Sequence, residues 1–397
     1  MSQHTKPSEV QASEFSLMQG GTFYKLNVWL KLCGPNLEFA ERKMIALIAI
    51  TWVPLFILSS LHDPIPDLKV PFLYNIEVHI RFLIALPTFI FAEVVANNRI
   101  RTLIKQFTLR NIVVPEDVPL LNKAIKKATR LSNLVIVDII LVILVFSLGN
   151  WTWGENFSID RVNTWYAIVK GDHKFFTSAG DWYAFVSLPI FQFILLRWLF
   201  HLAVFGYLLY QISKINLQLT PIHPDRAGGI GFLRTYLDLI VPFVFALSTL
   251  AAGGIAGKIL FEGAKLYDLR ITILVYVLTT VIITIIPLLL FARKLHNSKR
   301  RNFREYGILS TRYVQDFHDK WITGKTKHDE KLLGSPDIQS LADLDGSYSI
   351  IREMRLVPFT VRELTSLIII AIIPFLPLLL TVMSIEKIAE WVFSTLF

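Results

Sequence analysis

Long apolar runs, separated by shorter polar and basic segments, recur along the whole chain. A run of about 18 or more apolar residues is long enough to cross roughly 30 Å of hydrocarbon as a helix. The pattern predicts about seven transmembrane helices, near 44–61, 78–96, 131–148, 182–210, 236–260, 271–291 and 360–383. The second run is the poorest, because charged residues flank and interrupt it. We therefore expect an all-α, polytopic membrane protein in a lipid bilayer.

The composition agrees with this class and narrows the chemistry. Of the 397 residues, 53% are hydrophobic and 18% are charged, which lies outside the range of most soluble proteins. The single cysteine, Cys33, excludes an internal disulfide and a cluster of thiolate ligands. The sequence has no Walker-type phosphate loop and none of the common zinc or serine-hydrolase motifs. We predict neither a cofactor nor a metal.

The basic residues set the expected orientation. Most of the 40 Lys and Arg fall in segments that seven spans with the N-terminus inside would place in the cytoplasm. The C-terminus is then outside. Because membrane topology accounts for the excess positive charge, we expect no nucleic-acid partner.

The spans divide the chain into four parts. A short helix near 23–32 mixes apolar residues with lysines, as in a helix that lies in the membrane interface. The predicted parts are a cytoplasmic N-terminal segment with this helix (1–43), a six-span bundle with a basic cytoplasmic helical loop at 97–130 (44–291), a cytoplasmic helical segment (292–359), and a last span with a tail (360–397).

Local signals mark two helix starts near the end of the chain. Thr360 and Glu363 have the spacing of a capping box, which begins the last span. Ser335 followed by Pro336 predicts another helix start. Within 292–359, aromatic residues recur at helical spacing and require a surface to pack on, at Phe303, Tyr306, Tyr313, Phe317 and Trp321. A cytoplasmic protein partner could supply that surface.

Several ionisable residues fall within the predicted spans. A charged side chain in hydrocarbon costs at least about 2.5–3.5 kcal/mol, so such residues are candidates for function. Arg197, His201, Asp138, Asp238 and Glu93 could share one polar cavity that opens toward the cytoplasm. A structural salt bridge, for instance between Arg197 and Asp138, would explain the same residues without any function. Misplaced span boundaries are the third interpretation.

The loop between the fourth and fifth spans is the most unusual stretch. It is rich in glycine and precedes a helix, an arrangement that can present backbone amides to an anion. The candidate anion-binding residues are His223, Asp225, Arg226, Gly228, Gly229 and Gly231. The alternative is a tight loop in which Asp225 or His223 caps backbone groups. The absence of a third glycine argues against a dinucleotide site.

Three stretches resemble a group of bacterial multi-pass membrane proteins: 223–233 (HPDRAGGIGFL), 337–343 (DIQSLAD) and 352–359 (REMRLVPF). The resemblance implies a location in the bacterial inner membrane. It brings no functional residue with it.

Three functional classes follow. The first is a transporter or channel for an ion or a small anionic solute. The second is a membrane sensor or scaffold whose 292–359 segment binds a partner. The third is an enzyme acting on a lipid phosphate, with His223, Asp225 and His201 as acid–base groups, although no nucleophile accompanies them.

Two further features bear on these classes. Transport requires a continuous polar path through the membrane, whereas a scaffold requires only paired charges. Gly253 and Gly257 allow close helix packing, in a homo-oligomer or within one chain.

Overall fold

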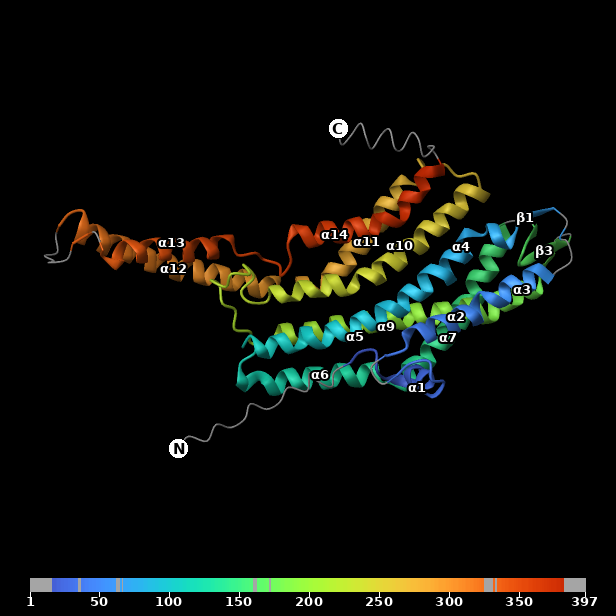
Figure 1. The fold of residues 1–397 in the computed structure, drawn as a ribbon, viewed down its shortest axis with the longest axis horizontal. Helices are drawn as coiled ribbons and strands as arrows, with labels where there is room; N and C mark the ends of the chain where they lie inside the picture. The colour runs from blue at the N-terminus through green and yellow to red at the C-terminus, as the bar shows by residue number, and fades with distance from the viewer. Residues whose placement is uncertain are drawn as a thin grey trace.

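The computed structural model describes residues 16–34, 37–61, 65, 67–159, 163–170, 173–324, 331–332 and 334–381. Long helices lie side by side in an elongated bundle, with a small sheet at one end and a helical hairpin at the other (Figure 1). The all-α, polytopic fold is confirmed. The hairpin lies on the side that the distribution of Lys and Arg predicts to be cytoplasmic.

Within the described residues, six helices or helix series are long and apolar enough to cross a membrane. They are α2 (Ala40–Thr51) with α3 (Val53–Leu61), α4 (Ile76–His79) with a π-helical turn (Ile80–Ala85) and α5 (Leu86–Leu109), α8 (Ser178–Trp182) with a π-helical turn (Tyr183–Ser187) and α9 (Leu188–Lys214), a 3₁₀ turn (Gly231–Arg234) with α10 (Thr235–Phe261), α11 (Arg270–Leu289), and α14 (Val361–Ile372) with a 3₁₀ segment (Ile373–Thr381). The seventh candidate is a pair bent by 43°, in which α6 (Val118–Ser132) is followed by α7 (Val135–Ile159).

The segment 97–130 is helical, as predicted: it consists of the end of α5, a 3₁₀ turn (Pro115–Asp117) and α6. One expectation is wrong. The third span was expected to end near residue 148 and be followed by a loop, but α7 continues to Ile159. No proline lies within α7, and a helix that has formed extends readily through residues without proline.

A four-stranded sheet, absent from the sequence prediction, packs at the end of the bundle opposite the hairpin (Figure 1). Its strands are β1 (Leu68–Val70), β2 (Asn163–Thr164), β3 (Ala167–Lys170) and β4 (His173–Phe176), and a 3₁₀ turn (Phe72–Tyr74) follows β1. The strands pair in chain order, β1 parallel to β2 and the others antiparallel. Strands this short show no alternating pattern that a sequence could reveal.

Proline creates a contact between the first and fourth spans. Pro54 has no amide hydrogen to donate to the carbonyl of Ile50, one turn earlier. Trp182 Nε1 donates to that carbonyl oxygen instead, at 3.0 Å. The hydroxyl of Ser187 donates to the next carbonyl, that of Thr51, at 2.7 Å. Side chains of one span thus satisfy backbone groups that the break in another leaves open.

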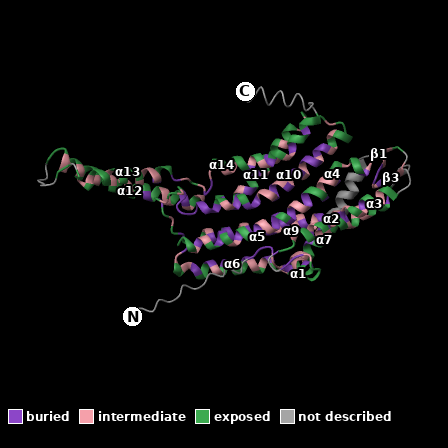
Figure 2. Ribbon diagram, in the orientation of Figure 1, coloured by how far each residue is buried: buried purple, intermediate pink, exposed green. Residues whose placement is uncertain are grey.

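Burial separates the core helices from the hairpin. Buried residues run along α5, α9 and α10 (Figure 2), and α10 has the largest buried share of all the candidate spans. The hairpin consists of α12 (Ala292–Trp321) and α13 (Pro336–Glu353). Both helices are described in full, and their only buried residues are Leu295, Asn302 and Ile351.

The two local signals near the end of the chain are confirmed. Ser335 caps α13 by accepting from the amide of Asp337, and Pro336 occupies the first turn. Thr360 and Glu363 form the complete capping box at the start of α14. The short N-terminal helix α1 (Gly21–Trp29) forms two residues earlier than expected.

Candidate functional site

Two ion pairs with little exposure to solvent join helices of the bundle. Arg197 Nη1 of α9 lies 2.9 Å from Asp138 Oδ1 of α7, with 5% and 13% of the two side chains exposed. Lys43 Nζ of α2 lies 2.6 Å from Glu93 Oε2 of α5. Arg197 also interacts electrostatically with Glu93, which places the two pairs in one cluster. Two cations therefore face two carboxylates.

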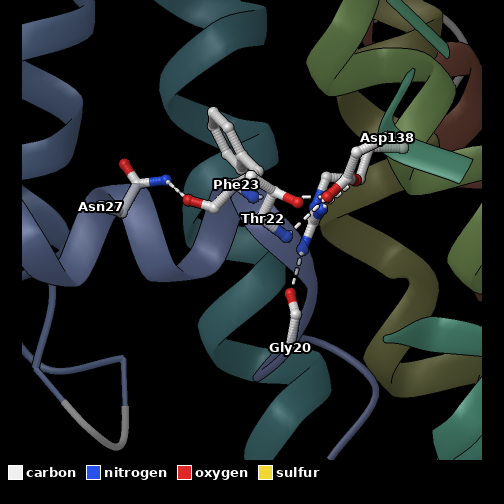
Figure 3. Close-up of polar contacts among 6 residues, drawn as sticks. Gly20, Thr22, Phe23, Asn27 and Asp138 are labelled. Carbon is white, nitrogen blue, oxygen red and sulfur yellow. Dashed lines mark hydrogen bonds and ion pairs between the residues drawn. The ribbon is translucent and has the colours of Figure 1, made fainter. Parts of the chain in front are cut away.

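The start of α1 completes the first pair. Asp138 Oδ2 accepts from the amide of Thr22 at 2.7 Å and from that of Phe23 at 3.3 Å (Figure 3). Arg197 Nη2 donates to the carbonyl oxygen of Gly20 at 3.0 Å. The free amides and the positive end of a helix stabilise a carboxylate in this position. Asp138 is thus held by a guanidinium and two amides at once.

Glycine is required where α1 meets the pair. Gly21 has φ 76°, in the left-handed region. A β-carbon there would lie 3.0 Å from Asp138 Oδ2 and 3.5 Å from Arg197 Nη1. Both the backbone conformation and the space therefore restrict this position to glycine.

The ring of Phe23 lies close to both cations. Lys43 Nζ lies 5.1 Å and Arg197 Cζ 5.2 Å from the centroid of the Phe23 ring. Phe193 packs edge-on against the same ring at 5.1 Å. Cation–π attraction is strongest where water is excluded, so Phe23 adds to the stabilisation of both charges.

The structure brings four of the predicted residues together and leaves one out. Arg197, Glu93 and His201 are buried, Asp138 pairs with Arg197, and His201 interacts electrostatically with Arg197 and Lys43. Asp238 is exposed on the first turn of α10, apart from the buried groups.

The sequence prediction omitted two contributors, Lys43 and the amides of α1. Lys43 was placed one residue before the first span, and α1 was placed at the membrane surface. A carboxylate deep in a span, such as Glu93, was the available signal that a cation must approach it.

The segment before α1 packs against α5. Leu17 and Met18 are buried, and Ser16 Oγ donates to Asn97 Oδ1 at 2.5 Å. Arg101 donates to Gln19 Oε1. Gln19 Nε2 and Asn97 Nδ2 are nevertheless buried without a hydrogen-bond partner among the described residues. Such atoms commonly bind ordered water.

Aromatic side chains fill the opposite end of the bundle. Phe72 and Trp165 pack edge to face at 5.0 Å, and Trp52 Nε1 donates to His79 Nδ1 at 3.0 Å. Trp165 also packs on Tyr183, to whose hydroxyl Arg81 donates. This end is therefore packed with rings. Trp165 Nε1 is buried there without a hydrogen-bond partner among the described residues.

The backbone amides of the glycine-rich loop donate to the carboxylate of Asp225, a residue of the same loop. Asp225 Oδ1 accepts from the amides of Ala227 at 2.8 Å and Gly229 at 3.1 Å, and Oδ2 accepts from Gly231 at 2.8 Å. His223 Nδ1 lies 3.0 Å from Asp225 Oδ1. These amides are the groups that we predicted from the sequence to bind an external anion. The geometry matches the alternative prediction of a tight, self-capped loop.

The electrostatics of Asp225 follow from these contacts. Burial alone would raise the pKa of its carboxyl group, but the hydrogen bonds from Ala227, Gly231 and Gly229 and the nearby His223 bring that pKa below its ordinary value. Asp225 is therefore a stable anion at neutral pH.

The loop also contacts the chain beyond α13. Arg355 donates from its amide to Arg226 O at 2.7 Å and from Nη2 to Asp225 O at 2.6 Å. The Arg226 side chain pairs with Glu353 at 2.8 Å, and both side chains are largely exposed. Gly228 and Gly229 have φ 64° and 92°, so the turn uses their conformational freedom.

The described part of the chain contains no group of three or more His, Cys, Asp or Glu side chains that could hold a metal ion. Comparison of the chain with protein-family models, with curated proteins and with solved structures finds no match. Its function is therefore inferred from its own geometry.

Proposed function

We propose that this protein is a membrane-anchored interaction module whose α12–α13 hairpin binds an acidic, amphipathic helix of a cytoplasmic partner. The observation that carries the proposal is a groove of about 570 Å³ on the hairpin. Its lining combines apolar and cationic side chains, at Phe303, Arg304, Gly307, Ile308, Thr311, Arg312 and Tyr348. Apolar helix faces bind such grooves, and arginines flanking the groove select acidic partners.

The two helices of the hairpin contact each other, for instance through Tyr313 and Trp321 of α12, which donate to Asp337 of α13, but they leave apolar side chains exposed. Phe303 and Tyr348 pack ring to ring at 5.0 Å, but Ile308, Leu309 and Val314 are about half exposed. Two helices in water need an apolar face buried against something to be stable. A partner helix in the groove would provide that burial.

The charges of the groove indicate the chemistry of the partner. Arg304 and Arg312 lie eight residues apart on α12, about 12 Å along one helix face. The groove lining, all of it within the described residues, contains no acid. A helix with glutamates or aspartates beside its apolar stripe is complementary to this surface.

The test uses the full-length protein in nanodiscs. The probe is a fluorescent peptide helix with leucines at positions i, i+3, i+4 and i+7 and glutamates beside them, and its binding is followed by anisotropy. A peptide with lysine in place of glutamate is the control ligand. We expect the combined variant Arg304→Ala and Arg312→Ala to bind the acidic peptide about thirtyfold more weakly, since two charge-assisted contacts of about 1 kcal/mol each are lost.

The matched control variant is Arg300→Ala, an exposed arginine of α12 outside the groove lining. It should bind like the wild type. Equal affinity for both peptides, or an undiminished affinity in the double variant, would overturn the proposal.

Transport is the second candidate, and a specific observation favours it. Ionisable side chains from α2, α5, α7 and α9 are buried together, beside the unpartnered atoms Gln19 Nε2 and Asn97 Nδ2. Flux of protons and ions in proteoliposomes, compared between the wild type and a folded Arg197→Ala variant, tests it. Flux that disappears in the variant would support transport through this cluster.

The third class, an enzyme acting on a lipid phosphate, gains no support from the geometry. His223 and Asp225 bond to each other and to backbone groups rather than converging on open space with His201. We also place the protein in the bacterial inner membrane, on the resemblance of 223–233, 337–343 and 352–359. Membrane fractionation of a bacterial host tests that location.

A further inference from the structure

A short strap after α9, residues 215–219, runs between the bundle and the start of α12. The amide of Gln218 donates to Ile112 O at 2.8 Å, and Leu217 forms a bridge with Val113. On the other side, Lys294 Nζ donates to Ile215 O. The strap is therefore held from both sides.

A pocket of about 250 Å³ lies between this strap and α12. We call it the strap pocket, and its lining is Asn216, Leu217, Leu219, Lys294, Asn297, Ser298 and Arg301. The polar members supply two cations, two carboxamides and one hydroxyl. None of these lining residues, which all belong to the described chain, is acidic.

The hydroxyl of Ser298 is the most informative group. Ser298 Oγ is buried and has no hydrogen-bond partner among the described residues. A serine within a helix usually donates to the carbonyl one turn earlier when nothing else engages it. The carbonyl of Ser298 itself accepts from Asn302 Nδ2 at 2.8 Å, so the local network is otherwise complete. A buried hydroxyl without a partner indicates a missing ligand or water.

The cations of the pocket are only weakly engaged by acids. Arg301 Nε lies 3.8 Å from Glu305 Oε1, and 66% of the Arg301 side chain is exposed. Burial lowers the pKa of the Lys294 ammonium, whose Nζ donates to the carbonyl oxygen of Ile215. An anion beside Lys294 and Arg301 would compensate both groups.

From these observations we propose that the strap pocket binds a phosphate group, through Lys294, Arg301 and the hydroxyl of Ser298. Asn216 and Asn297 can donate to further phosphate oxygens. The volume suits a small phosphorylated group rather than a nucleotide or other large ligand. The phosphate comes from a soluble ion or ester or from a lipid headgroup. The site is independent of the hairpin groove and of the self-capped Asp225 loop.

The test is thermal unfolding of the full-length protein in neutral detergent with inorganic phosphate, compared with chloride at equal ionic strength. We expect saturable stabilisation by phosphate, and a dissociation constant about tenfold weaker in Ser298→Ala and in Arg301→Gln. Ser298→Ala removes a hydroxyl that has no hydrogen-bond partner among the described residues, so its stability without phosphate should match the wild type.

Lys123→Gln provides the matched control. Lys123 belongs to a separate basic pocket, with Lys127 and Lys214, between α6 and α9. This variant should retain the wild-type dissociation constant. Phosphate no better than chloride, undiminished binding in Ser298→Ala, or equal weakening in Lys123→Gln would each overturn the proposal.

Nanodiscs distinguish the two sources of phosphate. One set contains only phosphatidylcholine, and the other contains phosphatidic acid in addition. If the headgroup is the ligand, phosphatidic acid should weaken the apparent affinity for inorganic phosphate in the wild type and have no such effect in Ser298→Ala. If the ligand is soluble, both sets should give the same affinity.

Discussion

The charged cluster of the bundle and the α12–α13 hairpin treat their charges in opposite ways. In the bundle, Arg197 and Lys43 are buried, and each pairs with a carboxylate and contacts the Phe23 ring. On the hairpin, Arg304 and Arg312 line an open groove with no acid in its lining, which lies wholly within the described chain. In the bundle the charges pair with one another, whereas on the hairpin the arginines are available to a partner.

This difference makes the hairpin a stronger candidate for function than the bundle. Buried ionisable residues in a membrane span suggest function by default, but a buried charge with a complete set of partners also serves to fix helix packing. The hairpin has the opposite signature, an exposed apolar groove with available cations. Four substitutions test this contrast, taken in order of decreasing effect on stability.

The largest effect is expected in the bundle. Arg197→Ala leaves Asp138 buried without its guanidinium, so we expect a loss of about 3–5 kcal/mol in the free energy of unfolding. Chemical denaturation in detergent measures it. The double variant Arg197→Met with Asp138→Leu removes both charges and should recover much of the loss. Equal losses in the single and double variants would contradict the idea that the unpaired Asp138 carboxylate causes the loss.

The Asp225 loop should show a smaller effect that depends on pH. Asp225→Asn cannot accept from three amides with the same strength, so we expect a loss of about 1–3 kcal/mol at neutral pH. Because the folded pKa of Asp225 lies below its ordinary value of 3.8, the difference between wild type and variant is fully present above pH 3.8. It should decline as the pH falls below 3.8. A difference that instead grows as the pH falls would contradict the assigned contacts.

The start of α1 should tolerate no side chain. Gly21→Ala forces a β-carbon into a left-handed conformation 3.0 Å from Asp138 Oδ2. We expect it to lose about 1–2 kcal/mol of stability. Gly254→Ala is the control, because a β-carbon there meets nothing within 4 Å. Thermal unfolding measures the stability of both variants. A Gly21→Ala variant as stable as the Gly254→Ala variant would contradict the described position of the start of α1 beside Asp138.

The smallest effect on stability belongs to the hairpin. Arg312 is exposed, so Arg312→Ala should change the free energy of unfolding by no more than about 0.5 kcal/mol. Its binding of the acidic peptide should nevertheless fall. A large loss of stability in this variant would indicate that Arg312 supports the fold rather than a partner.

Features fixed by neighbouring residues could be predicted from the sequence. The capping box at Thr360 and the start of α13 at Ser335 depend on residues a few positions apart, and both are confirmed. The membrane class could also be predicted, because an apolar run is a pattern of neighbouring residues. The strands β1 to β4 were missed because each is too short to show a pattern.

The site depended on contacts between distant residues. Lys43 meets Glu93 across 50 positions, and Thr22 meets Asp138 across 116. Neither partner could be chosen from the sequence alone. Asp238 was grouped with the cluster because α10 is apolar on all sides, so periodicity could not show which face is buried. The neighbours of Asp238, Leu237 and Leu239, are buried while Asp238 is exposed.

Hydrogen–deuterium exchange on the full-length protein in nanodiscs tests the contrast most directly. The amides of Gly229 and Gly231 lie in a loop but donate to Asp225, so they should exchange slowly. The amides of α12 beyond Asn302 lie in a helix with almost no buried face, so they should exchange much faster and slow down when the acidic peptide binds. A free hairpin protected as strongly as the core of α10, and unchanged by the peptide, would contradict its role as an unpartnered binding surface.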